Sequence, residues 1–143
     1  MSKTHGKATK EDLENMFELA EEVRKHSYCE YSGFRVGASV RAESGKVYTG
    51  CNVENSSYGA TMCAERVAIY KAIANGERRI TDVLVVTDSP DGWPPCGLCR
   101  QVISEFASKT MVHIANTKGI QKSVAFDDLM PMAFVPEHIT GKK

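Results

Sequence analysis

The sequence lacks the features that mark a membrane protein, an exported protein or a dedicated nucleic-acid binder. It has no run of about 18 apolar residues, so no segment is predicted to span a membrane. The beginning, MSKTHGKATKEDLENM, is polar and contains no apolar stretch of signal-peptide length. Lysine plus arginine equals aspartate plus glutamate, at 18 each, so the basic excess typical of nucleic-acid binders is missing. We therefore expect neither a membrane nor a nucleic acid as a partner.

The missing export signal favours the cytoplasm, where thiols are kept reduced. The chain has an odd number of cysteines, which also argues against a framework of disulfide bonds. They are Cys29, Cys51, Cys63, Cys96 and Cys99. In a reducing compartment these side chains are better interpreted as metal ligands, nucleophiles or small core residues.

The length of 143 residues suits one domain with a single core. We expect a flexible N-terminal tail over residues 1–8 and one catalytic domain over residues 9–143. Thr9, with Asp12 three residues later, predicts a helix N-cap. Hydrophobic periodicity predicts helices at about residues 11–26, 61–76, 98–108 and 127–130. Strands are expected at residues 34–42, 47–54, 80–88, 110–116 and 123–126, and residues 131–139 are expected to be extended. This alternation predicts an α/β fold, with a sheet flanked by helices.

Three of the cysteines occupy positions typical of a zinc site. Cys96 and Cys99 form a C-x-x-C motif where a loop rich in proline and glycine meets a predicted helix, and Cys63 lies at the start of another helix. Thiolates on two helix starts can converge on one tetrahedral Zn²⁺. Three protein ligands leave the fourth position open, which is typical of a catalytic site. The partial positive charge of the helix N-termini offsets the charge of the thiolates.

Two residues that follow Cys63 complete the candidate chemistry. Glu65 lies two positions after a ligand, so its carboxylate can approach the metal region without binding the metal. A carboxylate there can take a proton from water and pass it to a substrate nitrogen or a leaving amine. Arg66 can donate a hydrogen bond to a ligand sulfur and offset more of the thiolate charge. Taken alone, each residue has an ordinary structural interpretation, but the order C-x-E, about thirty residues, then P-C-x-x-C is much more specific.

This order resembles the zinc deaminase signature in its three-cysteine form. The segments YSGFRVGA, GCNVENSSYG, CAER, PCGLCRQVISEF and LMPMAFVPEHI together resemble the small homotetrameric cytidine deaminases of pyrimidine salvage. They cover the chain from about residue 9 to residue 139. The resemblance implies a three-layer α/β/α fold around a mixed five-stranded sheet, one Zn²⁺ per subunit, and hydrolysis of cytidine and 2′-deoxycytidine to uridine and 2′-deoxyuridine with release of ammonia.

The resemblance also implies roles for individual residues. Cys63, Cys96 and Cys99 match the zinc ligands of the family, and Glu65 matches its proton carrier. Five further residues match positions that bind the substrate. Asn52 and Glu54 match residues that bind the ribose hydroxyls, and Phe34 and Ala64 match positions that contact the base. Phe134 matches an aromatic residue that reaches the active site of a neighbouring subunit. The resemblance implies a homotetramer with active sites near the subunit interfaces, and Tyr31 and Tyr58 lie in segments that the family uses there.

Three alternatives remain open from the sequence. The first is a deaminase of another aminopyrimidine compound, such as a nucleoside antibiotic, although Asn52, Glu54 and Phe34 favour an ordinary nucleoside. The second is an enzyme that edits cytosines in polynucleotides, which would need a basic, aromatic-lined groove that the sequence does not supply. The third is a structural zinc module in which Cys51 is the fourth ligand and Glu65 is dispensable.

Overall fold

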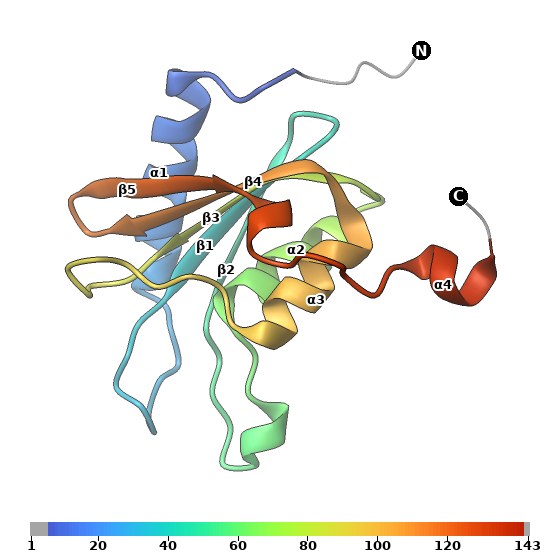
Figure 1. Ribbon diagram of the computed structural model, residues 1–143. Coiled ribbons are helices and arrows are strands. Elements are labelled where there is room, and N and C mark those ends of the chain that lie inside the picture. Colours follow the sequence, from blue (N-terminus) through green and yellow to red (C-terminus); the bar gives the residue numbers. More distant parts are fainter. Residues whose placement is uncertain (1–5, 142–143) are drawn as a thin grey trace.

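A five-stranded sheet runs through the centre of the protein, whose computed structural model describes residues 6–141 (Figure 1). The strands are β1 (Gly37–Ala42), β2 (Val47–Cys51), β3 (Ile80–Val86), β4 (Ala107–Asn116) and β5 (Gly119–Ala125). Their order in the sheet is β2-β1-β3-β4-β5. β3 and β4 pair in parallel, and the other neighbours pair antiparallel. The expected mixed five-stranded sheet is therefore confirmed.

Helices cover both faces of the sheet, which gives the three layers that the resemblance implied (Figure 1). Helix α1 (Lys10–Arg24) packs on one face, and α2 (Ala64–Ala74) and α3 (Gly97–Phe106) pack on the other. The remaining elements are the 3₁₀ turns η1 (Tyr58–Ala60) and η2 (Phe126–Asp128) and the short helix α4 (Pro136–Thr140). Among the described residues, no helix is both long enough and apolar enough to cross a bilayer.

Helix α1 forms as its sequence predicts. The hydroxyl of Thr9 accepts a hydrogen bond from the backbone N–H of Asp12 at 3.0 Å, and the Asp12 carboxylate accepts one from the Thr9 N–H at 2.9 Å. This reciprocal capping box satisfies two N–H groups that would otherwise lack partners. One turn apart on the helix, Met16 and Ala20 are fully buried against Leu84 and Val86 of the central strand β3.

The alternation of polar and apolar residues at 34–42 predicts a half-buried strand. The strand is present, but the expected burial is wrong. Strand β1 begins only at Gly37, and all six of its residues are buried. The alternation of polar and apolar residues suggested one solvated face, but β1 lies between β2 and β3 and has helices on both faces. Its polar residues are paired inside the protein: the Ser39 hydroxyl donates to the Met16 carbonyl at 2.8 Å, and Arg41 contacts Asp82.

The two ends of the domain also differ from expectation. Residues 131–139, expected to be extended, overlap α4, which begins at Pro136 and ends at Thr140, and Gly141 follows with a φ of 68°. Proline in the first turn and glycine after the last one favour a short helix. At the other end, the expected flexible tail lies partly outside the described residues, because residues 1–5 are not among them. The Gly6 carbonyl accepts a hydrogen bond from Arg41 at 3.1 Å, so this part of the tail touches the sheet.

Candidate active site

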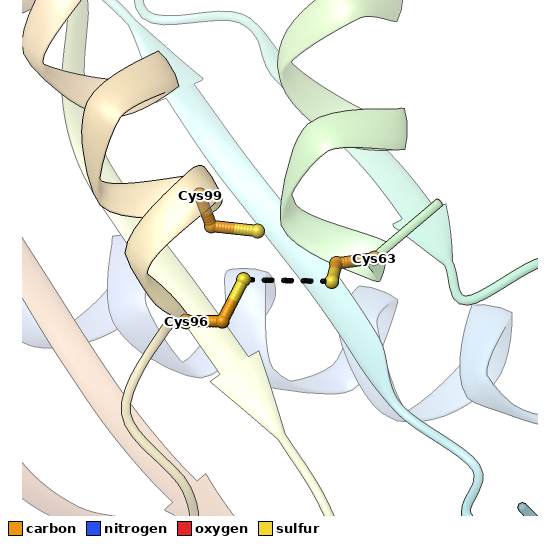
Figure 2. Close-up of side chains that lie close together, drawn as sticks. All are labelled: Cys63, Cys96 and Cys99. Carbon is orange, nitrogen blue, oxygen red and sulfur yellow. Dashed lines mark hydrogen bonds between the residues drawn. The ribbon is translucent and has the colours of Figure 1, made fainter. Parts of the chain in front are cut away.

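Two helix N-termini bring three cysteines together. Cys63 is the N-cap residue of α2, Cys96 is the N-cap residue of α3, and Cys99 lies in the first turn of α3. Their sulfur atoms all lie within 4.8 Å of one another, and the Cys63 and Cys96 sulfurs are 3.8 Å apart. Figure 2 shows Cys63 on the α2 side facing Cys96 and Cys99 on the α3 side. The expected ligand cluster therefore forms from segments more than thirty residues apart in the chain.

The cluster fits a zinc ion. Tetrahedral Zn²⁺ with Zn–S distances of about 2.3 Å requires sulfur–sulfur distances of about 3.8 Å, which is the separation of the Cys63 and Cys96 sulfurs. Within residues 6–141 the cluster contains only these three ligands, and Cys51 is not one of them. The closed four-cysteine site of the structural-zinc alternative is therefore not formed, and one coordination position is free for another ligand.

Arg66 lies beside the thiols. Its Nη2 donates a hydrogen bond to the Cys63 sulfur at 3.4 Å. Its Nε is buried and has no hydrogen-bond partner within the described part of the chain. Burial lowers the pKa of Arg66, but hydrogen bonds to the Cys63 and Cys99 sulfurs raise it, and the net result is a pKa above the ordinary value. The guanidinium is therefore a permanent positive charge that compensates thiolate charge at this site.

The pKa values of the Cys63 and Cys99 thiols are shifted in opposite directions. Hydrogen bonding from Cys99, and then from Arg66 and Cys96, lowers the pKa of Cys63 to about 5 against the opposing effect of burial. The same contact with Cys63, together with burial, raises the pKa of Cys99. At neutral pH the cluster therefore already holds one thiolate before a cation binds, and metal binding displaces the remaining protons.

Glu65 is buried in the first turn of α2, with only 4% of its surface exposed. Burial raises the pKa of its carboxyl group to about 7, and the negative charge of Cys63 contributes in the same direction. A carboxyl group with a pKa near neutrality can both accept and release a proton, which is what a general acid and base requires. Glu65 also lines the same pocket as Cys63 and Cys96.

The pocket beside the cluster has a volume of about 240 Å³. Its walls come from four separate parts of the chain, residues 32–36, 52–54, 61–65 and 93–96, together with Val85 and Thr87 near the end of β3. Phe34 and Ala64 are among the lining residues. The volume lies just below the range of about 300–1,000 Å³ for typical ligand pockets, so the pocket suits a small ligand or part of one.

Asn52 and Glu54 also line this pocket, just beyond the end of β2. Val53 between them points away and is 45% exposed. Both pocket residues hold the loop that carries Phe34. The Asn52 amide donates to the Phe34 carbonyl at 2.7 Å, and its oxygen accepts from the Val36 N–H at 2.9 Å.

The Glu54 carboxylate accepts hydrogen bonds from the backbone N–H groups of Tyr31 and Ser32, each at 2.9 Å, and from the Ser32 hydroxyl. These bonds, the Ser32 hydroxyl first, lower the pKa of Glu54. Glu54 therefore remains an anion at the pocket wall. Carboxylate and amide oxygens each carry further lone pairs, so both side chains keep capacity to bind a ligand.

Phe134 lies apart from the pocket of its own chain. Its side chain is 56% exposed, and its ring contacts that of His138 at a centroid distance of 5.4 Å. Tyr31 and Tyr58 form an edge contact with ring centroids 6.0 Å apart, and both are exposed. The role of Phe134 at a neighbouring subunit's active site stays a prediction, and so does the place of Tyr31 and Tyr58 near subunit interfaces.

Several lining residues received no role from the sequence, and Ser32 and Trp93 are two of them. Ser32 lines the pocket and donates to Glu54, and only its position in the loop before Phe34 could have indicated this. Trp93 lines the pocket next to Phe34. The sequence shows Trp93 three residues before Cys96. Whether its side chain points into the pocket depends on how the loop folds.

Comparison with known proteins places this geometry in a family. Residues 10–115 match the model of the cytidine and deoxycytidylate deaminase zinc-binding region. The chain belongs to this family. The matched region includes all three clustered cysteines and Glu65, so the family's zinc-binding segment coincides with the cluster seen in the structure.

Individual members of the deaminase family resemble the chain over most of its length. The cytidine deaminase of Sporosarcina psychrophila is 42% identical over 90% of this chain and 96% of the relative. That of Halalkalibacterium halodurans is 39% identical over 88% of this chain and 96% of the relative. The crystal structure of cytidine deaminase from Burkholderia pseudomallei superposes with a TM-score of 0.79 at 38% identity, covering 85% of this chain and 98% of that one.

Proposed function

We propose that this protein is a zinc-dependent cytidine deaminase, which hydrolyses cytidine and 2′-deoxycytidine to uridine and 2′-deoxyuridine and releases ammonia. One observation carries the proposal: three cysteine sulfurs that fit a zinc ion lie together, and two of these cysteines, Cys63 and Cys96, line a small pocket with the buried carboxyl group of Glu65. Membership of the deaminase family supports it, and so do the curated relatives named cytidine deaminase.

The chain supplies each requirement of the hydrolysis. Cys63, Cys96 and Cys99 hold the zinc, which when bound lowers the pKa of a water molecule so that it can attack a carbon at neutral pH. Glu65 takes the proton from the attacking water and passes it to N3 of the base, and then carries the second proton to the departing amino group. Its burial inside the pocket keeps these transfers away from bulk water.

Binding residues orient the nucleoside for this reaction. Phe34 packs against the base, the backbone at Ala64 hydrogen-bonds its edge, and Asn52 and Glu54 hold the ribose hydroxyls. The hydrogen bonds that link Asn52 and Glu54 to residues 31–36 fix the Phe34 loop and the ribose site as one unit. A pocket that is organised before the substrate arrives contributes the proximity part of the rate enhancement.

The protein is further proposed to act in the cytoplasm as a homotetramer. Reduced thiols are required for the metal site, and the cytoplasm provides them. Several large apolar side chains are exposed in the single chain, namely Tyr58, Leu98, Met132, Phe134 and Ile139. Burial of these side chains between subunits would remove them from water, with Phe134 reaching the neighbouring pocket. Light scattering on the purified protein measures the assembly.

Replacement of Glu65 by glutamine tests the proposed activity. The variant keeps the shape of the side chain but cannot carry protons, so we expect cytidine turnover to fall by about 10²–10⁴-fold while zinc stays bound. Turnover is followed by the loss of cytosine ultraviolet absorbance, and zinc by mass spectrometry of the metal. Cys96→Ser should lose zinc, whereas the matched thiol control Cys51→Ser should keep both zinc and turnover.

Two outcomes would count against the proposal. Cytidine turnover by zinc-loaded Glu65→Gln at nearly the wild-type rate would remove Glu65 from the mechanism. A zinc-loaded wild type that deaminates another aminopyrimidine nucleoside but leaves cytidine unchanged would correct the substrate and keep the reaction class.

A further inference from the structure

Trp93 forms one wall of the pocket together with Phe34. Their rings meet edge to face, with centroids 5.0 Å apart and an interplanar angle of 74°. Both residues line the pocket, and both keep exposed surface, 38% for Trp93 and 50% for Phe34. Aromatic pairs in this arrangement attract each other beyond the effect of buried area. The two rings therefore make a fixed corner at the side of the pocket.

The loop that carries Trp93 is anchored on both sides of the residue. Gly92 is buried with a φ of 71°, and a Cβ atom there would lie 2.7 Å from Ile114 Cγ2 and 2.9 Å from the Ala115 carbonyl oxygen. Only glycine allows this close approach in this backbone conformation. On the far side, Arg100 Nε donates to the Pro95 carbonyl at 2.8 Å. Trp93 therefore stands on backbone that is fixed against β4 and α3.

A second contact holds the start of the same loop. The Asn116 side-chain amide donates a hydrogen bond to the Pro90 carbonyl at 2.7 Å, and the Gly92 N–H donates to the Ser89 carbonyl at 3.0 Å. With the turn closed and tied to the end of β4, the backbone that carries the indole cannot move away from a ligand without breaking these hydrogen bonds. A stiff wall discriminates by size more strongly than a mobile one.

The orientation of the base in the pocket follows from the proposed function, on which this inference rests. C4 of the base must face the sulfur cluster, because that is where water attacks. N3 must face Glu65, which belongs to α2. In a pyrimidine ring C5 lies on the other side of C4 from N3, so C5 faces away from α2. Across the cluster from α2 is the segment that leads into Cys96 and α3 (Figure 2), and this segment contains Trp93 and Pro94.

We propose that Trp93 determines substrate specificity by closing the pocket around C5 of the base. The wall formed by Trp93 and Phe34 fits a hydrogen atom at C5 and excludes larger substituents. The protein therefore prefers unsubstituted cytosine nucleosides to nucleosides with a methyl group or a halogen at C5, and the preference increases with the size of the substituent.

The test compares the wild type with Trp93→Val, which shortens the wall, and Trp93→Phe, which retains an aromatic ring. We measure kcat/KM for cytidine, 5-methylcytidine and 5-iodocytidine with zinc-loaded protein. Trp93→Val should raise the ratio of 5-iodocytidine to cytidine by at least about tenfold over the wild type, the discrimination typical of one misplaced group in a rigid pocket. Trp93→Phe should change the ratio less. Asp91→Ala, an exposed change in the same loop, should leave the ratio unchanged.

A binding measurement separates this inference from the proposed function. Calorimetry gives dissociation constants for uridine and 5-methyluridine, and these measurements need no turnover. The dissociation constant for 5-methyluridine divided by that for uridine should be smaller in Trp93→Val than in the wild type. Trp93 is the sole tryptophan of the chain, so its fluorescence should also change when uridine binds to the wild type.

Each outcome has a distinct meaning. Deamination of cytidine with ratios that are the same in wild type and Trp93→Val would overturn the specificity role and leave the proposed function intact. Absence of turnover with any nucleoside would overturn the proposed function, and the binding ratios would still decide whether Trp93 limits the space at C5.

Discussion

The two faces of the sheet use polar groups in opposite ways. The face beneath α2 and α3 is covered by apolar side chains, including those of Val40, Val83 and Val112. At the helix N-termini on that side lie the clustered thiols and Glu65, beside the pocket. The face beneath α1 instead carries ionisable residues within the sheet itself. They are Arg41, Asp82 and His113, and all three are almost completely buried.

The buried charges beneath α1 satisfy one another. Asp82 is the centre of the network: its carboxylate lies 2.9 Å from His113 Nε2 and accepts a hydrogen bond from Arg41 at 3.4 Å. The other ring nitrogen of His113 is 2.7 Å from the Ser123 hydroxyl. With both nitrogens in use, His113 has no free atom for a metal. The polar groups of the network beneath α1 are therefore partners for one another, whereas the three cysteines on the other face are arranged as ligands for a metal ion.

The largest effect on the structural side should come from Asp82→Ala. Removing the carboxylate takes the nearest anion from the buried Arg41 guanidinium and leaves it the more distant carboxylate of Asp12, at 3.9 Å. We therefore expect the free energy of unfolding to fall by up to about 3–5 kcal/mol, the loss typical of a broken buried ion pair. Zinc content and uridine affinity of the folded protein should not change, because the network lies on the face away from the pocket. Urea titration measures stability, and calorimetry measures binding.

The control for Asp82 is an ion pair at the surface of the same layer. Glu22 and Lys25 on α1 lie 2.9 Å apart, with their side chains 67% and 69% exposed. Glu22→Ala should therefore change stability much less than Asp82→Ala does, because water screens an exposed ion pair. Equal losses in the two variants would mean that burial does not distinguish the network from the surface pair.

Gly37 and Gly50 lie against helices on opposite faces of the sheet, so a glycine-to-alanine change can be made on each face. A Cβ at Gly37 would overlap the Ala20 carbonyl oxygen of α1, and a Cβ at Gly50 would lie 2.5 Å from the Ala68 backbone nitrogen and 2.6 Å from the Ala64 carbonyl oxygen of α2. Each alanine variant should lose about 1–3 kcal/mol of stability, because backbone must move to make room.

Only one of the two variants should damage the site. Gly50→Ala displaces the first turn of α2, which carries Glu65, and a shift of about 1 Å there can lower kcat about 100-fold. Gly37→Ala displaces α1 and should leave the kcat of the folded protein near that of the wild type. We would assay both at a temperature where each is folded by circular dichroism. Equal losses of kcat would contradict the separation of the two faces.

The smallest effect concerns pH. Hydrogen bonds from Ser32 and Tyr31 hold the pKa of Glu54 below its ordinary value of 4.5. A carboxyl group with a lowered folded-state pKa stabilises the protein above the unfolded-state pKa, and this contribution disappears as the pH falls through the folded-state value. Glu54→Gln should therefore melt at a lower temperature than the wild type at neutral pH, and the difference should shrink in acid.

Differential scanning calorimetry at several pH values measures this difference. Glu18→Gln, an exposed change on α1, serves as the control and should melt like the wild type throughout, as surface substitutions usually do. A Glu54→Gln difference that stays constant into acid would show that the side chain stabilises the Phe34 loop without its charge.

Local patterns in the sequence predicted most of the elements and the cysteines that cluster in the structure. The capping box of Thr9 and Asp12 marked the start of α1, and the C-x-x-C motif placed Cys96 and Cys99 on one helix start. Both depend on contacts within a single turn. The burial of β1 could not be predicted in the same way, because Ser39 and Arg41 gain their partners from α1 and β3.

The sequence by itself determined the chemistry that this protein can perform. Cys63 and Glu65 are two residues apart, and Cys96 and Cys99 are three apart. Residues so close in sequence lie within one helical turn, so the spacing places each pair at the same helix end. Only the tertiary structure decided that the two helix ends meet, with the Cys63 and Cys96 sulfurs 3.8 Å apart. It also decided that Asn52 and Glu54 bind the loop that carries Phe34, and that the Trp93 ring packs against the Phe34 ring. Those contacts join segments distant in the chain, and the packing of helices against a shared sheet brings them together.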